Sequence, residues 1–367
     1  MTNEPDPFAP VEDVVEPTTR RDMVLAVTGL GSALLLALLS ILPAQFAIGA
    51  PGPTFNTLGE EDDGTPVVEI SGADTYPASG ELRLTTVSVA SASSTWFSLG
   101  QVLRGWVSDA RYVQPEEAVL GDPDERDAVE QQSEQQWVTS QQSATVAALG
   151  ALGQEVPATI TVAELTPESN AQGLLREGDL ITAIDGSPID SYTDLFDVLA
   201  TVAPGDDITV TVTRDGESLD ETFATLDDGD GGAVMGIYVR PDFDMPIDVT
   251  VNVDQVGGPS AGLMFALSIM DQLTEDDELN DAHVAGTGAI SADGDVEPIG
   301  GIRMKLHGAR DAGAAYFLAP VENCDEVVGN IPDGLSVFAV DDIDDGYAAI
   351  TAIGSGDTSG LATCDAS

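Results

Sequence analysis

The sequence predicts an α+β multidomain chain behind an N-terminal apolar helix, and three observations carry this prediction. The chain has 367 residues, which leaves room for two or three domains with buried cores. After an uncharged apolar run, strand-like alternation and helical periodicity occur in turn along the sequence. A polar, glycine-rich stretch at residues 227–232, which lacks the spacing of a calcium loop, predicts a flexible linker between two domains.

Acidic side chains dominate the composition and narrow the range of partners. The chain carries 64 Asp and Glu against 12 Lys and Arg, a formal charge of −52 at pH 7. Phosphate recognition depends on Lys and Arg, so this balance argues against nucleic acid and against an anionic membrane surface bound through basic patches. The excess acid is typical of a solvated surface and says little about function.

An uncharged segment near the N-terminus is long enough to span a bilayer. Residues Met23–Leu42 are mostly apolar, and Arg20 and Arg21 directly precede them. The length predicts a single-pass membrane anchor over residues 23–49, and the positive-inside tendency places residues 1–22 in the cytoplasm and the rest outside the cell. A cleaved signal peptide is the alternative, but the run exceeds the roughly 7–15 residues typical of one and no clear A-x-A site follows.

Residues 50–152 combine strand-like and helical patterns. Alternating β-branched segments predict strands near residues 67–70 and 82–89. Helical periodicity covers residues 96–107 and 127–152. We expect this membrane-proximal region to be either a unit of its own or part of the domain that carries the chemistry.

A compact unit follows, with a strand (ATITVAEL), a turn-rich segment (LLREGDLITAIDGSPI), a helix from about Thr193 and a further strand (DITVTVTRDG). On the Gly-Asp and Asp-Gly turns of that segment, it resembles a PDZ domain of the bacterial protease-associated kind. The resemblance implies a PDZ domain over residues 153–229 that adds a peptide or protein chain end to its sheet. A spacer with an occluded groove is the alternative.

Ser260 occupies a position suited to nucleophilic chemistry. A strand-like run over residues 247–253 is followed by GGPSAG and then by an apolar helix, so Gly258 and Pro259 form a turn that presents the serine. Its hydroxyl and nearby N–H groups would lie at the positive end of the helix dipole, which suits a developing oxyanion. The alternative is that Ser260 is only a helix N-cap.

Lys305 is the single lysine of the chain. If residues 302–313 form a helix, Lys305 lies among apolar residues on its buried face. Desolvation there would lower its pKa from about 10.4 towards roughly 7–8, giving a base able to deprotonate a serine. Because a P-loop also needs a lysine and the neighbours of Lys305 do not fit one, we expect no ATP site of that type and no cofactor.

The segments GGPSAG, GTGAIS and PIGGIRMKLHGARDAGA together resemble the proteolytic domain of Lon-type peptidases. The resemblance implies Ser260 as nucleophile, Lys305 as general base and Thr287 as the group that orients the amine. It covers about residues 233–350 and implies a Lon-type α/β proteolytic domain over residues 233–355, with a tail at 356–367. Because this is short for a complete Lon-type fold, the PDZ unit is a candidate insertion within it.

Two positions depart from the family pattern. Many Lon proteases have a carboxylate where this chain has Gly257, and a glutamate where it has Met304. An uncharged approach to the site would alter regulation or substrate choice without removing the dyad.

The histidines and cysteines have simpler interpretations. His283 and His307 are expected to be solvated and show no metal-ligand spacing, so neither a Ser-His triad nor a metal is predicted. Cys324 and Cys364 form a disulfide if they lie outside the cell, and otherwise are two free thiols.

The order of anchor, PDZ unit and Lon-type domain resembles the membrane-anchored PDZ-containing Lon-like proteases. It implies an ATP-independent serine endopeptidase that acts on unfolded or membrane-proximal extracytoplasmic proteins, with the PDZ unit assisting recruitment. Lon-type domains often form rings, so a homo-oligomer stays open. The alternative is a catalytically inactive PDZ adaptor that binds extracytoplasmic protein termini.

Overall fold

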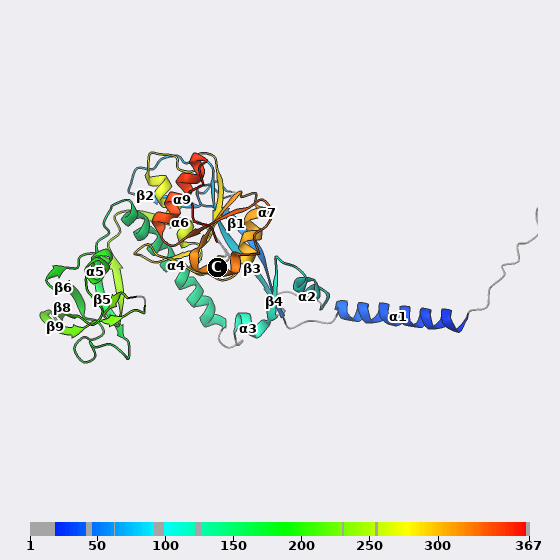
Figure 1. The fold of residues 1–367 in the computed structure, drawn as a ribbon, viewed down its shortest axis with the longest axis horizontal. Coiled ribbons are helices and arrows are strands. Elements are labelled where there is room, and N and C mark those ends of the chain that lie inside the picture. The colour runs from blue at the N-terminus through cyan, green and yellow to red at the C-terminus, as the bar shows by residue number, and fades with distance from the viewer. Residues whose placement is uncertain are drawn as a thin grey trace, which may run out of the picture.

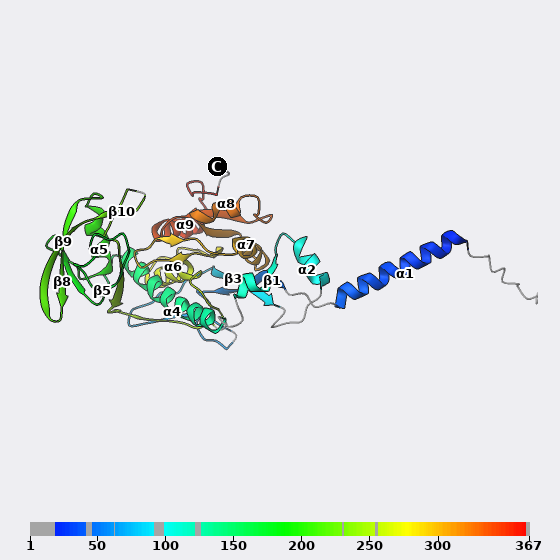
Figure 2. The same ribbon diagram turned by 90° about the horizontal axis from the view of Figure 1, so that it is seen from below.

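The computed structural model describes residues 19–41, 46–61, 63–91, 99–121, 126–229, 231–253 and 256–364. Figures 1 and 2 show a projecting helix α1, a central α/β body and a smaller β-rich unit at the end of the body opposite α1. The tail expected at residues 1–22 falls almost entirely outside the described residues, as do the last residues of the expected C-terminal tail.

Helix α1 (Arg20–Ile41) carries the apolar run. Its stretch Arg20–Leu38 is the one helix segment among the described residues that is long and apolar enough to cross a membrane, although a signal sequence would meet the same criteria. Strand β1 begins at Phe46 and pairs with two other strands, so the end of the range 23–49 expected for the anchor belongs to the folded body instead.

The central body is built on a mixed six-stranded sheet in the order β18-β17-β14-β3-β1-β4. Its strands are β1 (Phe46–Asn56), β3 (Glu81–Ser91), β4 (Tyr112–Pro115), β14 (His283–Gly286), β17 (Tyr316–Pro320) and β18 (Ser336–Val340). Neighbours from β18 to β3 run parallel, and β1 is antiparallel to both β3 and β4. Segments before and after the β-rich unit therefore share one sheet.

Helices cover both faces of this sheet, because alternate residues of its central strands point to opposite sides. Leu318 joins a core made with α4 and α6, whereas its neighbour Phe317 joins a core made with α7. The helices are α4 (Arg126–Ala151), α6 (Gly262–Leu273) and α9 (Ile343–Ser355) around the first core, and α7 (Ile302–Asp311) and α8 (Cys324–Val327) around the second. Helix α6 is buried on every side from Gly262 to Asp271.

The β-rich unit has its own sheet and its own core. The sheet runs in the order β12-β5-β6-β8-β9, and Leu195 and Leu199 of α5 pack onto it. Its elements are β5 (Ala158–Leu165), β6 (Leu180–Ile184), β7 (Ser187–Pro188), α5 (Tyr192–Ala200), β8 (Asp207–Arg214), β9 (Glu217–Ala224) and β12 (Ile237–Phe243). A capping box at Ser191, formed with Asp194, starts α5.

The boundary after the β-rich unit differs from the expectation. Strand β12 pairs with β5, so the sheet continues past residue 229 into the range 233–355 expected for the next domain. The expected linker at residues 227–232, in which residue 230 lies outside the described part, instead connects the hairpin strands β10 (Leu226–Asp227) and β11 (Ala233–Val234). Polar glycine-rich composition fits a tight hairpin connection as well as a linker.

Smaller elements complete the body. They are α2 (Leu99–Trp106), α3 (Glu116–Leu120), the pair β2 (Val68–Ser71) and β13 (Asp248–Val251), the pair β15 (Ala289–Ile290) and β16 (Val296–Glu297), and a 3₁₀ turn (Val321–Asn323). Cys324 and Cys364 form a disulfide with an S–S distance of 2.04 Å, which joins the C-terminal segment to α8.

Helix α6 ends beside a pair of buried acids, Asp271 and Glu278, which are 2% and 6% exposed. Glu278 Oε1 accepts hydrogen bonds from the hydroxyls of Thr274 and Tyr347. Burial, together with Glu278, raises the pKa of Asp271 to about 8. Within the described residues, neither oxygen of Asp271 has a conventional donor, which a proton shared between the two carboxyls explains.

The exchange Asp271→Asn tests this pair through the pH dependence of stability. An unfolded aspartate ionises near 3.9, while the folded one holds its proton to about pH 8, so wild-type stability falls as pH rises through this window. We expect the melting temperature of Asp271→Asn, relative to wild type, to increase from pH 4 to pH 8. Circular dichroism melts at pH 4, 6 and 8 measure this, with the exposed Asp276→Asn as control, and a difference independent of pH would contradict it.

Candidate active site

A glycine-containing turn places Ser260 between β13 and α6. Gly258 has φ +77°, a backbone conformation that favours glycine, and its N–H donates to the Ser133 carbonyl at 3.1 Å. A Cβ on Gly257 would lie 2.5 Å from Ser133 Oγ of α4, so a side chain there would require Ser133 to move. Ser140, also on α4, donates to the Pro259 carbonyl at 3.0 Å. Helix α4 therefore fixes the turn.

Ser260 is not the N-cap of α6. That helix begins at Gly262, and its cap residue Ala261 makes no side-chain capping bond. The Ser260 hydroxyl instead lies 2.8 Å from Lys305 Nζ. Its carbonyl accepts hydrogen bonds from Thr287 Oγ1 at 2.8 Å and from the Gly288 N–H at 3.0 Å, so backbone and side chain are both held.

Lys305 lies inside the protein, on the face of α7 that packs against the sheet, and is only 2% exposed. Nζ contacts two hydroxyls, Ser260 Oγ and Thr287 Oγ1, each at 2.8 Å. Burial lowers the pKa of Lys305 to about 7. About half of the molecules then hold a neutral amine at pH 7, against on the order of one in 2,500 for a lysine in water.

Thr287 joins the serine to the lysine. It follows β14 directly and is fully buried. Its hydroxyl donates to the Ser260 carbonyl and accepts from Lys305 Nζ, so one side chain sets the position of both groups. The close approach depends on Gly286, where a Cβ would meet Met264 Sδ at 2.5 Å.

A pocket of about 590 Å³ opens beside the serine and the lysine. Its described lining residues are Pro53, Phe55, Leu84, Thr85, Thr86, Val87, Ser88, Val89, Val256, Gly257, Ser260, Ala261, Gly300 and Lys305, none of which is acidic. The chain has 64 acidic residues, but none is among the described residues that line this pocket. Burial is therefore the dominant influence on the pKa of Lys305. Sequence reasoning did not place β1 and β3 at the site, because neither strand carries a recognisable motif.

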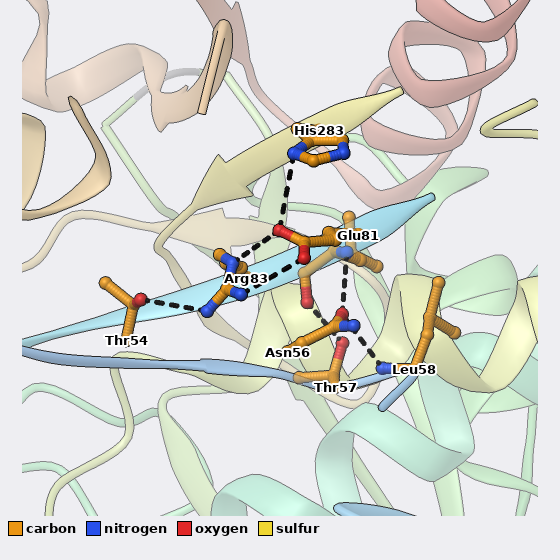
Figure 3. Close-up of polar contacts among 8 residues, drawn as sticks. Thr54, Asn56, Thr57, Leu58, Glu81, Arg83 and His283 are labelled. Carbon is orange, nitrogen blue, oxygen red and sulfur yellow. Dashed lines mark hydrogen bonds and ion pairs between the residues drawn. The ribbon is translucent and has the colours of Figure 1, made fainter. Parts of the chain in front are cut away.

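The two histidines lie away from this pair of groups. His283 begins β14, and a four-residue separation along an extended chain puts it about 13 Å from Thr287. Figure 3 shows His283 beside Glu81, at 3.5 Å, while Arg83 bridges Glu81 and Thr54. His307 is two residues beyond Lys305 on α7 and so points to a different side of the helix.

The single lysine makes its pKa directly measurable. In protein labelled with ¹⁵N and ¹³C only at lysine, we expect the side-chain Nζ and Cε resonances to titrate near pH 7, because the buried amine loses hydration in its charged form. In urea the same resonances should titrate near 10.4. A native midpoint close to the urea value would show that the amine is solvated.

Comparison with known families identifies two domains. A model described as the PDZ domain matches residues 137–224, and one described as the Lon protease (S16) C-terminal proteolytic domain matches residues 242–351. Among solved structures, the PDZ domain of the SdrC-like protein of Listeria innocua is 25% identical, covering 22% of this chain and 93% of that one with a TM-score of 0.22.

Curated relatives match the second domain. The Lon protease of Nitratidesulfovibrio vulgaris is 40% identical over 114 residues, covering 29% of this chain and 14% of that protein. Lon protease 2 of Herpetosiphon aurantiacus is 39% identical over 106 residues, covering 27% and 13%. Lon protease 2 of Bacillus subtilis is 35% identical over 99 residues, covering 27% and 17%. The match thus spans about one seventh of the length of these relatives. By the two family matches, the chain carries a PDZ domain and a Lon-type (S16) proteolytic domain.

Proposed function

We propose that the protein is a membrane-anchored, ATP-independent serine endopeptidase in which Ser260 is the nucleophile and Lys305 the general base. The observation that carries this proposal is the 2.8 Å contact between Ser260 Oγ and a buried lysine amine whose pKa lies near 7. A serine with a lysine base is a known form of nucleophilic catalysis. The S16 domain match supports the same reaction class.

In the proposed reaction the neutral amine of Lys305 takes the hydroxyl proton as Ser260 Oγ attacks the peptide carbonyl. The resulting ammonium gives this proton to the leaving amine, which breaks the C–N bond and leaves an acyl-serine. Lys305 then takes a proton from water as the water oxygen attacks the acyl carbon. The ammonium returns that proton to Ser260 Oγ as the ester C–O bond breaks, which releases the acid and restores both side chains. Thr287 holds the amine towards Ser260 throughout these steps.

Stabilisation of the oxyanion is assigned to the backbone N–H groups of Ser260 and Ala261. Within the described part of the chain, neither N–H donates a hydrogen bond, whereas those of Gly262 and Leu263 do. Both groups lie at the start of α6, where the helix dipole favours negative charge.

The substrate is proposed to bind as an added strand along β3. Strand β14 pairs with β3 only as far as Leu84, and residues 86–89 of β3 then line the pocket beside the dyad. An extended chain laid along this edge would satisfy the backbone groups there and bring a peptide bond to Ser260. Such binding requires a flexible or unfolded substrate, which fits a protease without an unfolding motor.

The PDZ domain and α1 are proposed to bring substrate and enzyme together. Strand β12 is one of the two edge strands of its sheet, and Phe196 of α5 and Tyr238 of β12 are both exposed, which suits capture of a chain end by strand addition. We propose that α1 is a retained anchor that places the catalytic domain outside the cell. We also propose that residues 46–152 and 245–355 form one proteolytic domain, with the PDZ unit inserted in it.

An inactive PDZ adaptor is the rival function. The Lys305 amine contacts the hydroxyls of Ser260 and Thr287, and its pKa is lowered to about 7. These features argue against an adaptor, because an adaptor has no need of a neutral buried amine.

Proteolysis by Ser260→Ala and Lys305→Arg variants tests the dyad. We expect the wild-type chain in detergent to cut an unfolded protein at a rate that rises with pH through about 7, as Lys305 loses its proton. Both variants should lose on the order of 10³-fold or more in kcat, because arginine keeps the charge but not the basicity. Mass spectrometry of the fragments gives the readout, with His307→Gln as the active control. Retained cleavage by Lys305→Arg would exclude the mechanism.

Substitutions of Thr287 test how much the orientation of the Lys305 amine contributes to catalysis, separately from its basicity. We expect Thr287→Val to lower kcat by about 10- to 100-fold with KM little changed, since Lys305 and the Ser260 carbonyl both lose a hydroxyl that positions them while the Ser260 hydroxyl and the pocket lining are kept. Thr287→Ser keeps the hydroxyl and should recover most of this loss. Steady-state kinetics on a quenched fluorescent peptide measures both, and equal defects in the two variants would assign Thr287 to packing alone.

A further inference from the structure

Helix α2 exposes an apolar face. Leu103 and Trp106 lie three residues apart on one side of α2 and are 49% and 58% exposed, and Val107, the residue directly after the helix, is 84% exposed. Large apolar side chains gathered in this way on a soluble protein mark an interaction surface.

The rest of α2 is firmly held, so this exposure is built into the fold. Val102 is fully buried against Ile48. A Cβ on Gly105 would lie 2.5 Å from Val113 Cγ2, which shows how closely the helix packs on β4. The Trp106 ring meets the Phe46 ring edge-on at 6.0 Å, so one side of the indole is fixed and the other is free.

The sequence around α2 is poorer in acidic residues than the rest of the chain. No Asp or Glu occurs between Glu81 and Asp109, although 64 of 367 residues are acidic, and Arg104 of α2 is among only 12 basic residues. A surface that must approach lipid head groups gains from losing carboxylates, because burying or crowding an acid near lipid is costly.

The position of α2 points to the occupant of this face. Helix α2 contacts α1, and both views place it at the end of the body from which α1 projects (Figures 1 and 2). The chain from Ile41 at the end of α1 to Phe46 at the start of β1 spans at most about 18 Å. If α1 crosses a bilayer, α2 therefore lies at the surface of that same bilayer.

We propose that α2 is a membrane-docking helix that rests in the lipid interface beside the anchor, with Leu103, Trp106 and Val107 among the upper acyl chains and Arg104 at the level of the phosphates. Tryptophan next to aliphatic side chains and a basic residue is the composition that such interfacial segments use. This inference rests on the proposed role of α1 as an anchor. It involves apolar insertion, not a basic patch, and so agrees with the net charge of −52.

Docking of α2 would fix the position of the catalytic cleft, meaning the pocket beside Ser260 and Lys305 together with its neighbour at β4, relative to the membrane. Strand β4 is the next element after α2, and its residues Tyr112 and Gln114 line a pocket of about 500 Å³. That pocket shares Val87, Val89 and Gly300 with the one beside Ser260 and Lys305, so the two pockets lie next to each other. The cleft would then receive chain segments that leave the membrane close to the enzyme, which narrows the substrate class to membrane-proximal segments.

Quenching of tryptophan fluorescence by brominated lipid tests the docking. The full chain, with Trp96→Phe in every sample so that only Trp106 and Trp137 report, is reconstituted in phosphatidylcholine vesicles with or without bromine on the acyl chains, as the otherwise wild-type chain and with Trp106→Phe or Trp137→Phe. We expect brominated vesicles to quench the wild type, Trp106→Phe to lose at least half of this quenching, and Trp137→Phe to retain it. Phenylalanine preserves the ring contact with Phe46, and Trp137 packs against Phe265 in the core, so both variants should fold.

The outcomes separate the inference from the proposals on which it rests. Equal quenching of wild type and Trp106→Phe would overturn the docking, and would be the result if a second copy of the chain covered the α2 face. Failure of the chain to float with vesicles would overturn both the anchor and the docking. Neither readout depends on proteolysis, so an inactive enzyme would leave the docking result valid.

Discussion

The burial of one amine against two hydroxyls is the constraint on which the site depends. Lys305 has no carboxylate partner in its described surroundings, so its charged form is poorly compensated and its pKa falls to about 7. An adjacent carboxylate would stabilise the ammonium and raise this pKa. The uncharged Gly257 and Met304, which depart from the pattern of many Lon proteases, are consistent with this requirement.

Segments that are far apart in the sequence together bury the Lys305 amine away from water. Helix α7 presents the lysine, β14 ends in Thr287, and α4 holds the Ser260 turn through Ser133 and Ser140. Strands β1 and β3 form the opposite wall of the pocket. The PDZ unit interrupts the sequence between these groups of elements, yet its own sheet and core leave the central sheet continuous.

The end of the molecule near α1, which is proposed to face the membrane, differs in composition from the rest of the chain. Acidic residues occur along most of the sequence but are absent between Glu81 and Asp109. This stretch includes α2, which exposes apolar side chains beside α1. The same β1–β4 pair that supports α2 also borders the cleft. The proposed anchor, the proposed docking helix and the pocket are thus connected through β1 and β4, which would give the proposed enzyme a fixed orientation towards lipid-proximal chains.

Local sequence patterns predicted many of the helices and turns of this protein. The helix periodicity around Lys305, the GGPSAG turn and the apolar N-terminal run each predict an element that the structure contains, because they depend on neighbours within a few residues. Local patterns were weaker at boundaries: residues 227–232 form a hairpin connection, and β12 extends the PDZ sheet, since strand pairing is set by distant partners. Sequence alone determined that a lone lysine and an exposed serine were candidates for a dyad. Only the tertiary structure decided that they meet, because the 2.8 Å contact and the lowered pKa arise from packing of α4, α6, α7 and the sheet around them.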